Sequence, residues 1–117
     1  MSEKREIEKI IEDLQVLEQQ LQAVLIEKQT LQAESNEIEN ASLELAKTGD
    51  EVYKILGGIM MRANKDVLMK ELEEKKKLIA IKVRALEKQE ESIAKRSDEM
   101  RGEIQKSLSA NPGNSKQ

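Results

Sequence analysis

The stretch from residue 51 to residue 67, EVYKILGGIMMRANKDV, decides the fold of this chain. Its flanks favour β-structure, and Gly57-Gly58 at its centre can supply the positive φ angles of a two-residue hairpin turn. The pattern predicts strands over residues 52–56 and 59–63. A two-residue turn would place these residues opposite each other: Leu56 and Ile59, Ile55 and Met60, Lys54 and Met61, Tyr53 and Arg62.

Both faces of this hairpin would be largely apolar. One would carry Val52, Leu56, Ile59, Met61 and Ala63, and the other Tyr53, Ile55 and Met60. A lone hairpin is marginal in water, and an apolar sheet edge left open would aggregate. No other segment is free to cover it, so we predict a sheet shared between subunits. We assign these residues to oligomerisation: Val52, Tyr53, Ile55, Leu56, Gly57, Gly58, Ile59, Met60 and Met61.

The segment before the hairpin, about 3–47, has the heptad pattern of a coiled coil. With Ile7 at position a, the d positions are all apolar: Ile10, Leu17, Val24, Leu31, Ile38 and Leu45. The a positions are apolar only in the first half: Ile7, Leu14, Leu21, Lys28, Ser35 and Ser42. Such a run without Pro or internal Gly predicts a long helix, with Gly49 as its stop signal.

A second helix is predicted over about 66–108, with Asp66 as its N-cap. One column is mainly apolar: Leu72, Ile79, Leu86, Ile93, Met100 and Ser107. A weaker column stands beside it: Met69, Lys76, Val83, Glu90, Ser97 and Ile104. Asn111-Pro112-Gly113 would prevent continuation. The predicted organisation is a helix over 1–48, an oligomerisation hairpin over 49–65, a helix over 66–109 and a disordered tail over 110–117.

The two helices have matching lengths and complementary seams. If the second helix folds back antiparallel to the first, residues such as Leu14 and Met100, or Leu21 and Ile93, lie opposite each other. The apolar d positions then cover the half of the helix where the a positions are polar. Residues 1–50 carry a net charge of −7 and residues 51–117 carry +4, which favours this pairing. The predicted fold class is all-α dominated: a long antiparallel two-helix coiled coil joined by one β-hairpin.

The composition excludes several classes of protein. The 117 residues are 38% hydrophobic and 37% charged, with one aromatic and no Cys or His. A compact globule usually has large aromatic anchors, and thiol or histidine chemistry and a histidine metal site are impossible. Apolar runs do not exceed four residues and the N-terminus lacks an apolar signal core. We expect a cytoplasmic protein that binds no membrane and, with a net charge of −3, no nucleic acid.

Other candidate motifs have simpler explanations. The Lys75-Lys76-Lys77 run follows Glu71, Glu73 and Glu74, so it is interpreted as a solvated helical face with i,i+4 pairs. Adjacent carboxylates at 73–74 and 90–91 point about 100° apart on a helix, which argues against paired acid–base work. Gly57-Gly58 lacks the surroundings of a phosphate loop. We therefore predict no catalytic residue, no metal and no cofactor.

The open end of the coiled coil differs from the rest because apolar residues concentrate there. They are Ile7, Ile10, Ile11 and Leu14 on the first helix and Met100, Ile104 and Leu108 on the second. Ile11 stands outside the a and d columns. These residues are either ordinary coiled-coil core with frayed ends or an exposed apolar patch that binds a partner.

A coiled-coil helix, one hairpin containing Val-Tyr-Lys and Gly-Gly, and a return helix together resemble the beta-type subunits of the prefoldin family. The resemblance covers about residues 3–110 and is most specific in EVYKILGGIMMRANKDV. It implies a hexamer with alpha-type subunits, two alpha and four beta, whose hairpins build a β-barrel. It implies an ATP-independent chaperone that holds non-native polypeptides at the coiled-coil tips and passes them to a group II chaperonin. The seven apolar residues of the open end would then be the client-binding residues.

Two other classes compete with this interpretation. A structural scaffold or adaptor would use the hairpin merely to close a helical hairpin and would keep its tips polar, whereas this chain concentrates Ile there. An enzyme is the third class and has no supporting motif.

Overall fold

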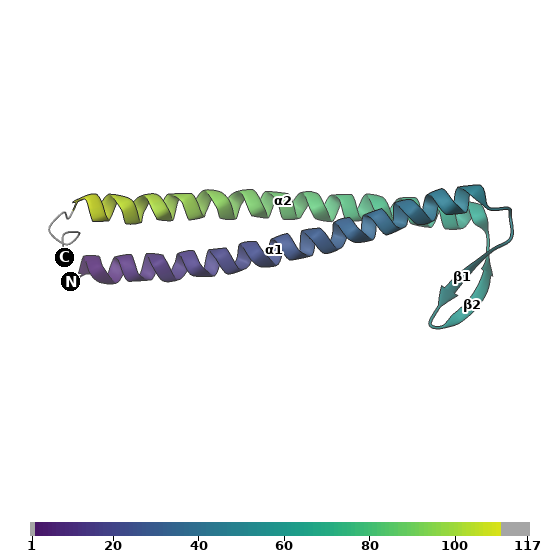
Figure 1. The fold of residues 1–117 in the computed structure, drawn as a ribbon, viewed down its shortest axis with the longest axis horizontal. Coiled ribbons are helices and arrows are strands. Elements are labelled where there is room, and N and C mark those ends of the chain that lie inside the picture. Colours follow the sequence, from purple (N-terminus) through teal and green to yellow (C-terminus); the bar gives the residue numbers. More distant parts are fainter. Residues whose placement is uncertain (1, 111–117) are drawn as a thin grey trace. The chain divides into compact units, whose positions relative to one another are not determined.

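The computed structural model describes residues 2–110, in which two long helices flank one β-hairpin (Figure 1). The elements are α1 (Ser2–Lys47), β1 (Val52–Leu56), β2 (Ile59–Ala63) and α2 (Lys65–Ala110). The predicted fold class, two long helices joined by one hairpin, is confirmed. The predicted break at Asn111-Pro112-Gly113 and the remaining tail lie outside the described residues.

The structure divides into two compact units. The terminal unit contains residues up to Glu27 and from Leu86 onward, and the hairpin unit contains Lys28–Ala85. In the terminal unit, the start of α1 lies antiparallel to the end of α2 (Figure 1). Leu17, Val24 and Leu86 are buried there, and Arg101 Nη2 lies 3.2 Å from Glu18 Oε1 across the two helices.

In the hairpin unit, the end of α1 and the start of α2 also share an apolar seam and an ion pair. Ile38 and Leu45 of α1 and Ile79 of α2 are buried at the predicted seam positions. Lys76 of α2 donates to the Glu39 carboxylate of α1, whereas Lys77 pairs with Glu73 on its own helix at 3.7 Å, the predicted i,i+4 contact. The apolar seam, rather than these exposed ion pairs, supplies most of the stability.

The predicted N-cap of the second helix is wrong. Asp66 is not the N-cap, because α2 already begins at Lys65 and the Asn64 Oδ1 accepts a bond from the Val67 N–H at 3.1 Å. The first helix stops where predicted, since α1 ends at Lys47, just before Gly49. The φ of Gly49 is not positive, and the Thr48 hydroxyl donates to the Leu45 carbonyl at 2.7 Å, which satisfies a carbonyl of the last turn.

The hairpin has the predicted register. β1 and β2 pair antiparallel, with Leu56 opposite Ile59 and Tyr53 opposite Arg62. Gly57 and Gly58 have φ angles of 57° and 79°, a region where residues with a Cβ are strained. The turn therefore depends on both glycines.

Candidate functional site: the hairpin and the ends of the helices

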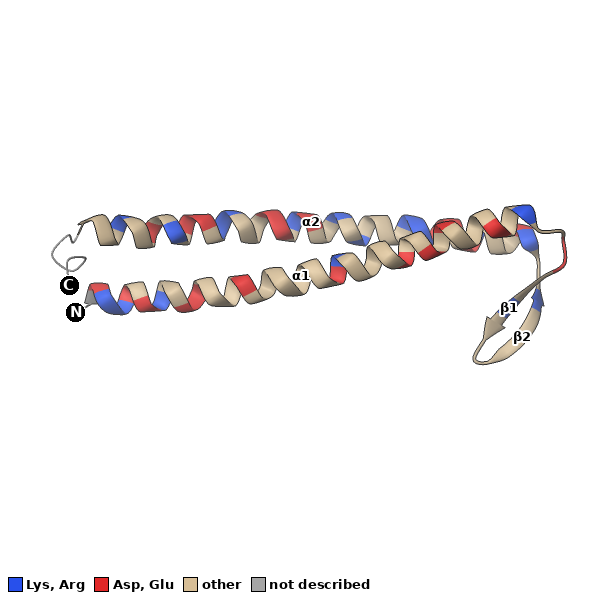
Figure 2. Ribbon diagram, in the orientation of Figure 1, with Lys and Arg blue, Asp and Glu red and all other residues tan. Residues whose placement is uncertain are grey.

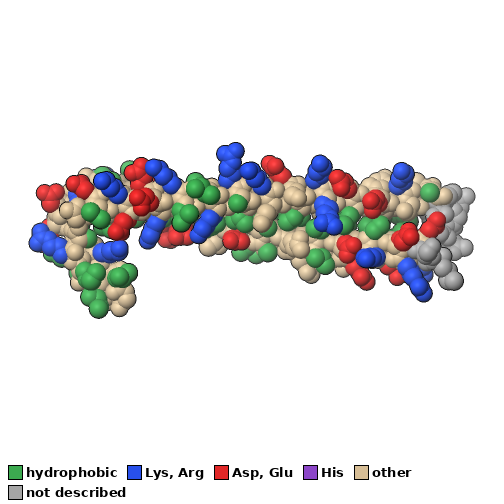
Figure 3. Space-filling model, turned by 180° about the vertical axis from the view of Figure 1, so that it is seen from behind, with side chains coloured by type: hydrophobic (Ala, Val, Ile, Leu, Met, Phe, Trp, Pro, Cys, Tyr) green, Lys and Arg blue, Asp and Glu red, His purple; other side chains and the backbone are tan. Residues whose placement is uncertain are grey.

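The hairpin offers a nearly continuous apolar surface. Val52, at the base of β1, is 6% exposed, but Ile55, three residues further along the strand, is 68% exposed. The other large apolar side chains of the hairpin are also exposed: Tyr53, Leu56, Ile59, Met60 and Met61. The hairpin is thus anchored at its base and uncovered toward its turn, and Figure 3 shows hydrophobic side chains gathered there.

The charged residues of the two strands are Lys54, in the middle of β1, and Arg62, near the end of β2. No charged residue lies between Lys54 and Arg62 in the sequence, and the ribbon around the turn is accordingly tan in Figure 2. Lys54 Nζ lies 3.1 Å from Glu71 Oε2 of α2. The Tyr53 hydroxyl donates to Glu51 Oε1 at 2.7 Å, and this carboxylate, followed by desolvation, raises the pKa of the Tyr53 phenol.

The seven apolar residues of the open end all belong to the terminal unit, where they have two different environments. Five lie half-buried at the seam positions of the helix pair: Ile7, Ile10, Leu14, Met100 and Ile104. Ile11 and Leu108 are exposed. This end therefore combines a coiled-coil seam with two exposed apolar side chains outside the seam. A role in client binding stays a prediction.

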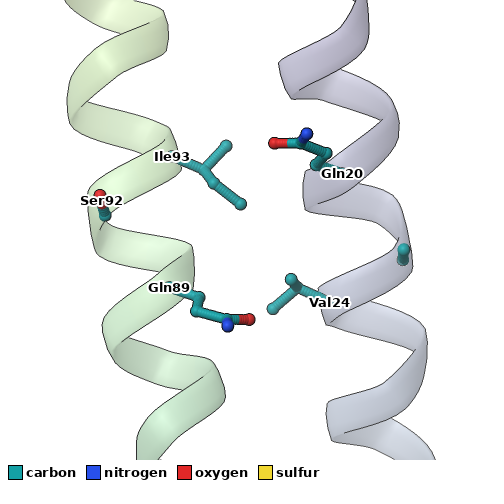
Figure 4. A pocket seen from close by; sticks show the side chains of 6 residues that line it. Gln20, Val24, Gln89, Ser92 and Ile93 are labelled. Atoms are coloured by element: carbon teal, nitrogen blue, oxygen red, sulfur yellow. The ribbon is translucent and has the colours of Figure 1, made fainter.

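A groove between the helices of the terminal unit was not predicted from the sequence. Gln20 and Val24 of α1 face Gln89 and Ile93 of α2 across a solvent-open space of about 450 Å³ (Figure 4). The heptad pattern identifies Val24 and Ile93 as seam residues and pairs Ile93 with Leu21, but it carries no information on the separation of the two helices. A gap of this kind could not be read from periodicity.

Two kinds of site are not found within residues 2–110, a metal-binding cluster and a membrane-spanning helix. No group of three or more carboxylates is placed to hold a metal ion there. In the same range, neither helix combines the length and the apolar character that crossing a membrane requires.

Comparison with known proteins gives the family. The model of a family described as prefoldin subunit matches residues 8–111. The chain belongs to the prefoldin subunit family. Prefoldin subunit beta of Archaeoglobus fulgidus is 36% identical over 110 residues, which cover 92% of this chain and 95% of that protein. Prefoldin subunit beta of Pyrococcus furiosus is 31% identical over 105 residues, with 88% and 90% covered.

The fold agrees with a solved prefoldin. The crystal structure of the prefoldin beta subunit from Thermococcus strain KS-1 matches with a TM-score of 0.82 and 31% identity, covering 88% of this chain and 92% of that one. The resemblance to beta-type prefoldin is therefore confirmed. Prefoldins are a chaperone family, and their beta subunits assemble with other prefoldin subunits.

Proposed function

We propose that this chain is the beta-type subunit of a hexameric prefoldin in which two alpha-type and four beta-type subunits share a β-barrel built from their hairpins. The assembly holds non-native polypeptides at the terminal units without ATP and passes them to a group II chaperonin in the cytoplasm. The observation that carries this proposal is the hairpin, whose apolar side chains are exposed on both faces.

The hairpin suits assembly because a two-stranded hairpin without further cover is only marginally stable in water. Two strands with exposed Ile55, Leu56 and Met60 expose both apolar surface and unpaired strand edges. Pairing with the hairpins of other subunits satisfies the edges and buries these side chains together. Each fully buried side chain of this size contributes roughly 1.5–3 kcal/mol, so a few of them sustain a stable complex.

The terminal unit suits weak, multiple binding of clients. Ile11 and Leu108 offer apolar contacts outside the seam, and the charged residues around them keep single subunits soluble. One such contact is weak, but several terminal units fixed to one assembly bind a single unfolded chain with a high effective concentration. Capture of this kind requires no chemical step.

The test is light scattering of a chemically denatured client, for example citrate synthase diluted from guanidinium, with this chain alone and with an archaeal alpha-type prefoldin subunit. We expect the mixture to suppress aggregation and added ATP to change nothing. Ile11→Ser with Leu108→Ser should raise the concentration needed for half-suppression by at least about fivefold, because two exposed apolar contacts per terminal unit are lost.

The matched control is Val16→Ser with Ile26→Ser, which removes two exposed apolar side chains from the same unit. It should protect the client nearly as well as the parent. If both double variants protect equally, the client site is not at the helix ends. If the unsubstituted assembly does not protect any client, the chain is a scaffold subunit instead.

A further inference from the structure

Lys54 is the one charged residue on its face of the hairpin, where it stands between Val52 and Leu56 on β1 and opposite Met61 on β2. Its Nζ lies 3.1 Å from Glu71 Oε2, near the start of α2. Val52 on the same face is buried, whereas Tyr53 and Ile55 on the opposite face are exposed. Leu56, Ile59 and Met61 of the Lys54 face are exposed as well, so this face is covered only at its base and is attached to α2 through Lys54.

We propose that the Lys54–Glu71 pair positions the hairpin for assembly, and that it neutralises the lysine before this face is buried between subunits. This inference rests on the proposed function, since it concerns how the hairpin is presented to a second prefoldin subunit. Lys54 and Glu71 are positioning residues, while the apolar side chains make the contacts.

The geometry supports a positioning role. The hairpin is joined to the helices by short connections, residues 48–51 before β1 and Asn64 after β2. A two-stranded ribbon on such connections can pivot about its base. The pair attaches the middle of β1 to α2 at a residue 17 positions away in the sequence. This second attachment restricts the orientation of the hairpin relative to α2, so assembly loses less conformational entropy.

The electrostatics explain why the pair matters in the assembly rather than in the single subunit. The side chains of Lys54 and Glu71 are 38% and 43% exposed, so water screens the pair in the subunit and its effect on folding is small. Assembly would remove water from the hairpin. An unpaired ammonium among Val52, Leu56 and Met61 would then oppose burial, whereas the paired one is already compensated by its own chain.

The test compares single and double variants in assembly with an archaeal alpha-type prefoldin subunit, followed by the concentration dependence of the complex in sedimentation. Glu71→Gln should weaken assembly by at least about tenfold, because removing one partner leaves a charge buried and unpaired. Lys54→Met with Glu71→Gln should restore most of the loss, since neither charge remains. The exchanged pair, Lys54→Glu with Glu71→Lys, should restore part of it.

The matched control is Glu73→Gln, which breaks an ion pair with Lys77 on the same helix, two residues from Glu71 and with no link to the hairpin. It should assemble like the parent. Far-UV helicity and the melting temperature of the isolated subunit should be the same for Glu71→Gln and Glu73→Gln.

Two outcomes overturn the inference while leaving the proposed function intact. Either Glu71→Gln assembles as well as Glu73→Gln, or the Lys54→Met, Glu71→Gln double variant is as weak as Glu71→Gln alone. Failure of the unsubstituted chain to assemble would instead contradict the proposed function itself.

Discussion

At the scale of single residues, Ser97 is the clearest local conflict in the terminal unit. Only 4% of its surface is exposed, and its hydroxyl has no hydrogen-bond partner among the described residues. A buried hydroxyl without a partner loses its hydrogen bonds to water on folding and forms none within the protein, which lowers the stability. It occupies a seam position at which a coiled coil ordinarily carries an apolar side chain.

We therefore expect Ser97→Ala to raise the free energy of unfolding. Ala is also the better helix former, so the control is Ser92→Ala, an exposed serine on the same helix that shares this propensity gain. In urea denaturation, the free energy of unfolding of Ser97→Ala should be higher than that of Ser92→Ala by roughly 0.5–1 kcal/mol. A Ser97→Ala protein less stable than Ser92→Ala would mean that the hydroxyl makes a stabilising bond in solution.

Sequence reasoning was less accurate for the start of the second helix than for the seam. The heptad columns identify Leu17, Val24 and Ile79 as core because burial follows the helical period over many turns. The cap at Asp66 was misplaced because Asn64 offers an equally good acceptor two residues earlier, and the helix starts at the first residue that can satisfy its N–H groups. Competing caps of similar strength cannot be ranked by sequence alone.

At the scale of elements, the hairpin was predictable almost completely. A two-residue Gly-Gly turn permits only one pairing register of the two strands, which is the one observed. Both glycines have the positive φ angles that this turn requires. The contact between Lys54 and Glu71 was not predictable. It depends on the angle at which the hairpin meets α2, and neither strand pattern nor heptad pattern contains that angle.

Replacing Gly57 and Gly58 together with Val tests this element. The substitution forces β-branched residues into positive φ, which costs on the order of 1–3 kcal/mol each. Assembly with an alpha-type prefoldin subunit should fail in sedimentation, while far-UV helicity should largely persist because the helix seams are unchanged.

Gly49→Val is the matched control for the turn. Gly49 has an ordinary φ, and no atom lies within 4 Å of the position where a Cβ would stand. This variant should assemble normally. Normal assembly by the Gly57, Gly58 double variant as well would show that the two-residue turn is not needed for the interface.

At the scale of the whole molecule, the proposed account separates two tasks. The hairpin unit presents an apolar ribbon without charged residues around its turn, which suits permanent contact with other subunits. The terminal unit presents a few apolar side chains beside a seam that contains an unsatisfied serine and an open groove, which suits weak contact with many clients. Both tasks follow from the sequence pattern, whereas the exposure of individual side chains and the groove between the helices are known only from the structure.

Native mass spectrometry can show whether the hairpin makes this chain a subunit of a larger prefoldin assembly. The chain is mixed with an archaeal alpha-type prefoldin subunit over a range of ratios, and the masses of the complexes are recorded. An exposed apolar hairpin requires other hairpins to cover it, so we expect a complex, with the composition of two alpha-type subunits and four copies of this chain that the resemblance to beta-type prefoldins implies. A folded, monomeric chain at every ratio would contradict this expectation.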